Sequence, residues 1–274
     1  MLPSFVPPKE RSIITKVCGD PDRYLPFRQH APSLSNARQE IYMDVDQLLS
    51  DDGVGFFNVL AFRGVFFGSP FAISDRYRWF DSLEDWVSFQ DAEKEEAKKF
   101  KGEEYYVKKN CYGQSQPGRK LSLLSSYWER RGEWKKMLNK PEKPTVGKVI
   151  RWLTSRSIDD DSNSTTKLFG NIGNLTAILI CGDLVEAGVL PMPSTSDWAS
   201  SIIKMGKGSK EGMIICGFVG EKKCSEKEFC DAFISLDQAL QTELSEEEKA
   251  AMGYNIVMLE HTLCKIKRLG VDSF

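Results

Sequence analysis

Residues 168–184, "LFGNIGNLTAILICGDL", hold two short apolar runs on either side of "NIG" at 171–173. The second run closes on "GD" at 182–183. This pattern predicts a helix, a tight turn and a second helix that begins at about Asn174. Two interpretations follow. The turn is either a corner between packed helices or a loop that holds a phosphate group.

The phosphate-binding interpretation rests on the outline of a helix–hairpin–helix element. In such an element the turn exposes successive backbone N–H groups, and the following helix adds its positive N-terminal end, so a DNA phosphate is bound without a basic side chain. Asn171 stands where the first glycine of the turn is usual, and asparagine tolerates a positive φ better than other non-glycine residues. The residues expected to bind phosphate are Asn171, Gly173, Asn174 and Thr176.

The rest of the chain predicts a mainly α-helical protein. Six prolines without a sustained period lie in residues 1–32, so we expect an extended N-terminal arm over 1–34. From 35 to 274, amphipathic patterns predict a single all-α domain of about ten helices, with a loop at 102–120. "GMIICGFVG" (212–220) fits a strand as well as a helix.

Capping signals mark the late helices. Ser225 with Glu228, and Ser245 with Glu248, have the spacing of capping boxes. Gly270 follows a run of basic residues and is expected to end the last helix.

Composition narrows the function classes. The 274-residue chain has a formal net charge of −2, which argues against strong non-specific attraction to nucleic acid. Seven cysteines at irregular spacing form no disulfide pattern, and Cys224 and Cys230 lack the partners of a zinc site. No secretion signal and no apolar run of membrane-spanning length is visible. We therefore expect an intracellular protein, cytoplasmic or nuclear, with no membrane contact, metal or cofactor.

The charge is distributed unevenly along the chain. Residues 94–151 contain sixteen Lys and Arg against seven Glu, and aromatic residues are interleaved with them. Basic side chains neutralise a nucleic-acid backbone while aromatic rings stack on bases, so 101–151 is a candidate basic, aromatic face. Its candidate contacts are Lys108, Arg119, Lys120, Tyr127 and Trp128. The alternative is that the tryptophans are half-buried helix residues and the lysines only keep an outer face solvated.

A second candidate anion site is "KMGKGSKEGM" at 204–213, where glycines and lysines alternate. The spacing is not that of a P-loop. A glycine-rich turn that opens a helix can still bind phosphate, and a solvated loop is the equal alternative. The candidate residues are Lys204, Lys207, Gly208 and Lys210.

Two charged residues stand inside apolar runs. Arg63 lies between "AF" and "VFF" and needs an anion nearby, while Asp183 follows a long apolar segment. Asp183 is a sensible partner for Arg63, which would make them a buried ion pair. The other interpretation is that Asp183 sits in a pocket as a catalytic carboxylate.

At this point the chain resembles a family. "GNLTAILICGDLVEAG" followed by "MGKGSKEG" is similar to the DNA-glycosylase-like helical families linked to thymine hypermodification. These are the helical domain of 5-hydroxymethyluracil DNA kinases and the glutamyl/putrescinyl-thymine pyrophosphorylases. The matching residues are Gly173, Ala177, Asp183, Leu184, Gly206, Lys207, Gly208, Arg38, Ile41, Tyr42, Phe57, Asn58 and Arg63.

The resemblance implies a base that leaves the stack and is held in a pocket. It makes Asp183 a carboxylate that stabilises positive charge on a sugar or activates a nucleophile. Arg38 and Arg63 would orient it or hold phosphate, and Asp197 is a second candidate carboxylate, although a helix N-cap role is open for it.

The sequence thus predicts a DNA-glycosylase-like helical protein that binds DNA and acts on a modified base or nucleotide. Two alternatives stay open: a non-catalytic helical binding or scaffold protein, and a helical enzyme that acts on a small phosphorylated metabolite with 204–213 as its anion site.

Overall fold

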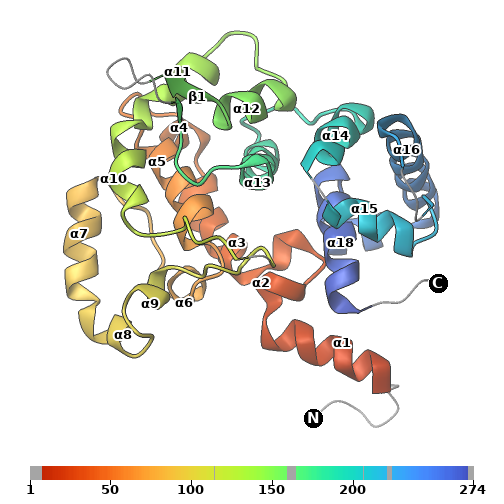
Figure 1. Ribbon diagram of the computed structural model, residues 1–274, viewed down its shortest axis with the longest axis horizontal. Helices are drawn as coiled ribbons and strands as arrows, with labels where there is room; N and C mark the ends of the chain where they lie inside the picture. Colours follow the sequence, from red (N-terminus) through yellow and green to blue (C-terminus); the bar gives the residue numbers. More distant parts are fainter. Residues whose placement is uncertain (1–7, 114, 159–164, 206, 221–223, 271–274) are drawn as a thin grey trace. The chain divides into compact units, whose positions relative to one another are not determined.

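The computed structural model describes residues 8–113, 115–158, 165–205, 207–220 and 224–270, and helices dominate it (Figure 1). The chain forms two compact units. The central unit is Ser33–Met192, and the terminal unit combines the residues before and after it. The predicted helical class is confirmed. The single domain expected for 35–274 stays a prediction.

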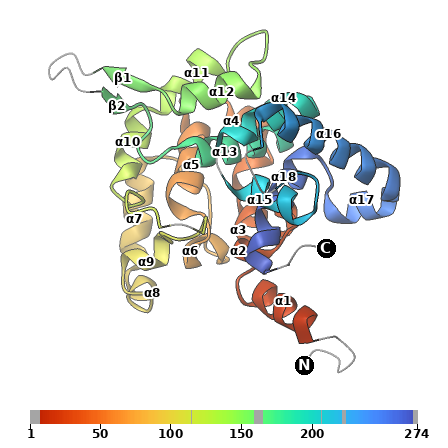
Figure 2. The same ribbon diagram turned by 45° about the vertical axis from the view of Figure 1, so that its right-hand side comes forward.

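The central unit contains short helices and one small hairpin (Figure 2). Its elements are α3 (Pro32–Ala37), η2 (Arg38–Tyr42), α4 (Val45–Leu48), α5 (Val54–Ala61), η3 (Phe62–Phe66), α6 (Pro70–Ile73), α7 (Leu83–Ala92), α8 (Lys94–Lys98), α9 (Glu103–Tyr106), α10 (Leu123–Glu129), η4 (Arg131–Glu133), α11 (Trp134–Met137), α12 (Val146–Leu153), β1 (Arg156–Ile158), β2 (Thr165–Lys167) and α13 (Asn174–Glu186). The two strands pair antiparallel.

Helix α5 and the π-helical turn η3 form the core of this unit, since every residue from Val54 to Phe67 is buried. A helix that is apolar all round is stable only when other elements surround it. Asn58, the polar residue within α5, is satisfied: its Nδ2 donates to Val54 O and Phe80 O, and its Oδ1 accepts from Phe80 N. These bonds attach the segment before α7 to the core helix.

The terminal unit contains α1 (Pro8–Gly19), α2 (Pro21–Tyr24), η1 (Arg28–His30), α14 (Thr195–Ile202), η5 (Ile203–Met205), α15 (Lys207–Ile215), α16 (Glu226–Glu243), α17 (Glu246–Met252) and α18 (Ile256–Leu269). Both predicted capping boxes are present, and Gly270 ends α18 with a φ of 75°. The ambiguous stretch 212–220 is helical up to Ile215, followed by Gly217 at a φ of 76°.

The expectation of an extended arm over 1–34 is wrong for the residues that the structure describes, because most of them are helical. Pro8, Pro21 and Pro32 each open a helix. Proline is tolerated there, since the first helical N–H has no partner within the helix in any case. The prolines therefore begin helices in this segment.

Helices α15 and α18 pack closely in the terminal unit. A Cβ built on Gly212 would lie 2.3 Å from the Leu263 carbonyl oxygen, and one on Gly208 would lie 2.7 Å from Cys264 Sγ. The two glycines thus let the helices approach at backbone distance. Within the described ranges, no helix is both long and apolar enough to cross a bilayer.

Candidate functional site

The turn at 168–173 follows strand β2, so the first helix of the expected helix–hairpin–helix element is missing. Asn171 has a φ of 59°, as its place in the turn predicts. Ile172 is fully buried, its N–H donates to Phe169 O, and its carbonyl accepts from Lys167 Nζ. The expected hairpin that presents its amides is therefore not confirmed, because the Ile172 amide is already engaged within the turn. The turn is a packed corner at the start of α13.

The four residues expected to bind phosphate at this turn have different surroundings. Asn171 Nδ2 donates to Gly64 O at 3.4 Å, and Thr176 is buried. Gly173 has a φ of −107°, which any residue can adopt, and Asn174 is exposed. Burial removes Thr176 from any contact with an external ligand.

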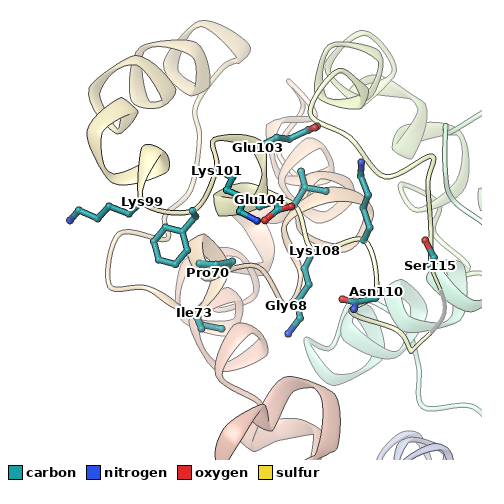
Figure 3. Close-up of a pocket in the computed structure, with 13 residues that line it drawn as sticks. Gly68, Pro70, Ile73, Lys99, Lys101, Glu103, Glu104, Lys108, Asn110 and Ser115 are labelled. Carbon is teal, nitrogen blue, oxygen red and sulfur yellow. The ribbon is translucent and has the colours of Figure 1, made fainter.

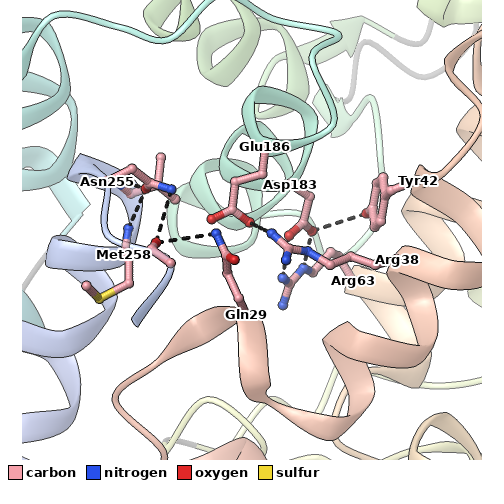
Figure 4. Close-up of polar contacts among 10 residues, drawn as sticks. Gln29, Arg38, Tyr42, Arg63, Asp183, Glu186, Asn255 and Met258 are labelled. Carbon is pink, nitrogen blue, oxygen red and sulfur yellow. Dashed lines mark hydrogen bonds and ion pairs between the residues drawn. The ribbon is translucent and has the colours of Figure 1, made fainter. Parts of the chain in front are cut away.

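Asp183 is held by a buried ion pair (Figure 4). Arg63 Nη2 donates to Oδ1 at 2.6 Å and Arg63 Nε donates to Oδ2 at 2.5 Å, while the Tyr42 hydroxyl donates to Oδ2 at 3.1 Å. Burial alone would lower the pKa of Arg63, but the Asp183 carboxylate outweighs it and raises that pKa. Burial, and then the Asp183 charge, raise the pKa of Tyr42. The ion-pair interpretation is confirmed.

This geometry does not fit a catalytic carboxylate at Asp183. Both of its oxygens accept from Arg63, and its side chain has no exposed surface. Glu186 lies one helical turn after Asp183 on α13, and it pairs at 2.8 Å with Arg38 of η2, which is about one-third exposed (Figure 4). Arg38 and Arg63 therefore both bind carboxylates of α13. Their surroundings are those of structural cations.

Asp197 has a local structural role. It is the third residue of α14 and is exposed, and its backbone N–H and its Oδ2 both bond to the Oγ of Ser194, the N-cap residue. Asp197 thus lies in the first turn of α14, as the alternative interpretation predicts, and Ser194 occupies the N-cap position.

Two of the expected nucleic-acid contacts are buried. Arg119 Nε donates to Val65 O at 2.9 Å, Arg119 Nη2 donates to Arg63 O at 2.7 Å, and Nη1 contacts Cys111 Sγ. The Tyr127 hydroxyl donates to Gly170 O at 2.6 Å. Neither side chain reaches the surface, because both satisfy backbone carbonyls inside the central unit. This corrects the expectation that they contact a ligand.

Trp128, Lys108 and Lys120 lie nearer to solvent. Trp128 is half-buried, packs edge-on against Phe57, and has the Arg131 guanidinium 4.0 Å from its ring centroid. Lys120 is exposed. Lys108 lines a groove of about 820 Å³ between α6 and α9 (Figure 3). That groove has a mixed lining: Gly68, Pro70, Ile73, Lys99, Phe100, Lys101, Glu103, Glu104, Val107, Lys108, Lys109, Asn110 and Ser115.

The glycine-rich segment 204–213 opens helix α15. Gly206 and the side chain of Lys207 lie outside the described residues. Lys204 is exposed and pairs with Glu226 at 3.3 Å, and Lys210 is half-buried. Gly208 faces Cys264, so its lack of a side chain serves helix packing. The anion site expected at 204–213 stays a prediction.

A second groove, of about 810 Å³, lies where α11 leads into α12 and is strongly basic. Its lining is Met137, Lys140, Pro141, Glu142, Lys143, Pro144, Lys148, Arg151 and Trp152. Its four cations are exposed. Across the part of the chain that the structure describes, none of them lies in ion-pair contact with a carboxylate. We call this surface the basic groove.

Helix α12 explains how the basic groove forms. Val146, Val149 and Leu153 are buried on one side of the helix, which places Lys148 and Arg151 on the solvent side. Residues three apart share a helix face, so the two cations lie together. Lys148 and Arg151 fall within the predicted basic face 101–151 but are not among its candidate contacts. The i, i+3 spacing of Lys148 and Arg151 before Trp152 was the signal that could have found them.

Comparison with known proteins does not assign a class. No protein-family model, no curated protein and no solved structure matches the chain. The resemblance to DNA-glycosylase-like families stays a prediction.

Within the described ranges, no group of three metal-ligating side chains is close enough to hold an ion.

Proposed function

We propose that this protein binds nucleic acid and that the basic groove is its contact surface. The observation that carries the proposal is the set of four exposed cations, Lys140, Lys143, Lys148 and Arg151, around one tryptophan. The lining adds a single negative charge, Glu142, so the groove carries a formal charge of +3. A polyanion that spans the groove meets several positive charges at once.

The electrostatics favour a polymer over a single anion. Each phosphate that a cation neutralises releases condensed counterions, so affinity falls steeply as salt rises. Exposed surface lysines bind one isolated phosphate weakly because water screens each contact. The whole chain has a net charge of −2, so binding is expected to be local to this surface.

The proposed function is binding, and Asp183 has no catalytic role in it. A carboxylate whose two oxygens are held by an arginine cannot accept a proton or approach a sugar without breaking a buried ion pair. The alternative of a small phosphorylated ligand is distinguished by one outcome of the binding experiment.

The test measures fluorescence anisotropy of labelled single- and double-stranded oligonucleotides at about 50 and 200 mM salt. The groove variant is Lys148→Glu/Arg151→Glu, and the control is Lys94→Glu/Lys98→Glu, which makes the same charge change at two exposed lysines of α8. We expect the groove variant to lose about tenfold or more in affinity and the control to lose much less.

Three outcomes would contradict the proposal. They are the absence of binding by the wild type at low salt, equal losses in both variants, and binding that millimolar inorganic phosphate or ATP abolishes while salt does not. The last outcome would favour the small phosphorylated ligand. Circular dichroism of both variants checks that the charge reversals leave the helical fold intact.

A further inference from the structure

Trp152 is fixed in position by two aromatic neighbours. Its ring stacks on Phe56 at a centroid distance of 5.4 Å and an interplanar angle of 29°, and it meets Phe169 edge to face at 5.3 Å. Phe56 belongs to the buried helix α5. The stack on Phe56 covers one face of the indole, and Trp152, which stays partly exposed, lines the basic groove.

The two tryptophans of the basic segment 101–151 are placed differently. Trp134 is 2% exposed, and the guanidinium of Arg131 lies over the ring of Trp128. At Trp152 the structure instead combines a rigid aromatic ring with Lys148 and Arg151, which come from the same helix. A rigid ring beside cations is the arrangement that binds bases and phosphates together.

We propose that the ligand of the basic groove is a single-stranded nucleic acid, one base of which stacks on Trp152 while the neighbouring cations hold its phosphates. This inference rests on the proposed function. Bases within a duplex are already stacked on each other and offer no free face to a ring fixed in a groove wall. An unpaired strand offers one at every nucleotide.

The stacking is expected to tolerate sequence. Every base has a π face, and the groove's cations reach phosphates whatever the base. Single-stranded DNA and RNA share this chemistry. The test therefore compares oligo-dT with oligo-rU of equal length, together with a closed DNA dumbbell whose bases are paired except in its two short end loops.

The main variant is Trp152→Leu, with Trp152→Phe as the conservative replacement that keeps a ring. We expect Trp152→Leu to weaken binding of single strands by on the order of tenfold and binding of the dumbbell by much less, and Trp152→Phe to retain most of the affinity. A preference for oligo-dT or oligo-rU would tell which strand is the better ligand.

A second readout is independent of any loss of stability from removing Trp152. Binding of an oligonucleotide to the wild type is expected to quench tryptophan fluorescence, and Trp152→Phe is expected to remove most of that quenching while binding persists. Unchanged quenching in Trp152→Phe, or a dumbbell bound as tightly as a single strand, would overturn the inference.

The two proposals fail in different ways. If Lys148→Glu/Arg151→Glu weakens binding but Trp152→Leu does not, the stacking inference is wrong and the nucleic-acid surface stands. If the charge reversals have no effect, the proposed function itself is wrong.

Discussion

Arg63 and Asp183 are 120 positions apart in the sequence, yet they form a two-point ion pair with N–O distances of 2.5 and 2.6 Å. The pair joins the π-helical turn η3 to helix α13 in the interior of the central unit. Arg63 O in turn accepts from the Tyr112 hydroxyl and from Arg119. The charged residues that most resemble catalytic groups in the sequence are therefore part of the core.

Replacing Asp183 by Asn is expected to destabilise the central unit strongly. Removal of one partner leaves the Arg63 charge buried and uncompensated, which costs about 3–5 kcal/mol. Urea denaturation followed by circular dichroism measures the change. The matched control is Asp197→Asn, at an exposed helix start, where the loss is expected to be much smaller. Equal stabilities for the two variants would show that the buried pair does not hold the fold.

Arg119 and its neighbour Lys120 provide a second comparison. Arg119→Met removes the donors for the Val65 and Arg63 carbonyls, so we expect a loss of about 1–3 kcal/mol or more of unfolding free energy. Lys120→Met changes an exposed residue and should leave stability nearly unchanged. Thermal unfolding of both variants is the measurement. A surface role for Arg119 would instead predict similar stability and a difference only in ligand binding.

The glycines of 204–213 are expected to respond as packing residues. Gly212→Ala places a Cβ against the Leu263 carbonyl, so α15 and α18 must separate and the melting temperature should fall by several degrees. Gly147→Ala, in α12, meets only the far end of Arg151 at 3.7 Å and should be neutral or slightly stabilising. A Gly212→Ala protein that melts like the wild type would contradict the close helix crossing.

Lys265 gives the terminal unit a predictable pH dependence. Its buried ammonium donates to Asp22 O and Arg23 O, both at 2.8 Å, and burial followed by the charge of Arg268 lowers its pKa from 10.5 to about 7. Between pH 7 and 10.5 the unfolded chain binds more protons at this site than the folded chain, so stability rises with pH there. The contribution is fully present above pH 10.5 and is lost as pH falls toward 7.

The measurement for Lys265 is the difference in unfolding free energy between the wild type and Lys265→Met at pH 7, 8.5 and 10. Other titrations largely cancel in this difference. We expect it to shift in favour of the wild type by about 1.4 kcal/mol or less per pH unit. A difference that stays constant over this range would mean that Lys265 keeps an ordinary pKa in the folded protein.

What could be predicted from the sequence depended on local interactions. The capping boxes at Ser225 and Ser245 and the positive φ of Asn171 follow from residues within three or four positions. The sequence also predicted an anion beside Arg63, because its apolar neighbours indicate burial and a buried charge requires a partner. The helical class followed from apolar periodicity.

Predictions based on proline content or on local charge were wrong where they concerned the placement of a residue. The prolines of the N-terminal segment open helices, and Arg119 and Tyr127, which read as part of a basic aromatic face, point inward. Composition along the chain does not say which side of an element a residue occupies, and for these residues the side was set by contacts with η3 and with the turn before α13.

The sequence by itself determined the helical class, the caps of the late helices and the pairing requirement of Arg63, because propensity, capping and the cost of burying a charge act locally. Tertiary structure alone decided that the turn at 168–173 follows a strand and is packed, that Asp183 is held at both oxygens, and that Trp152 lines a groove with four cations. Those features arise when segments distant in sequence bury their apolar faces against each other, which assigns every remaining side chain to the core or to the surface.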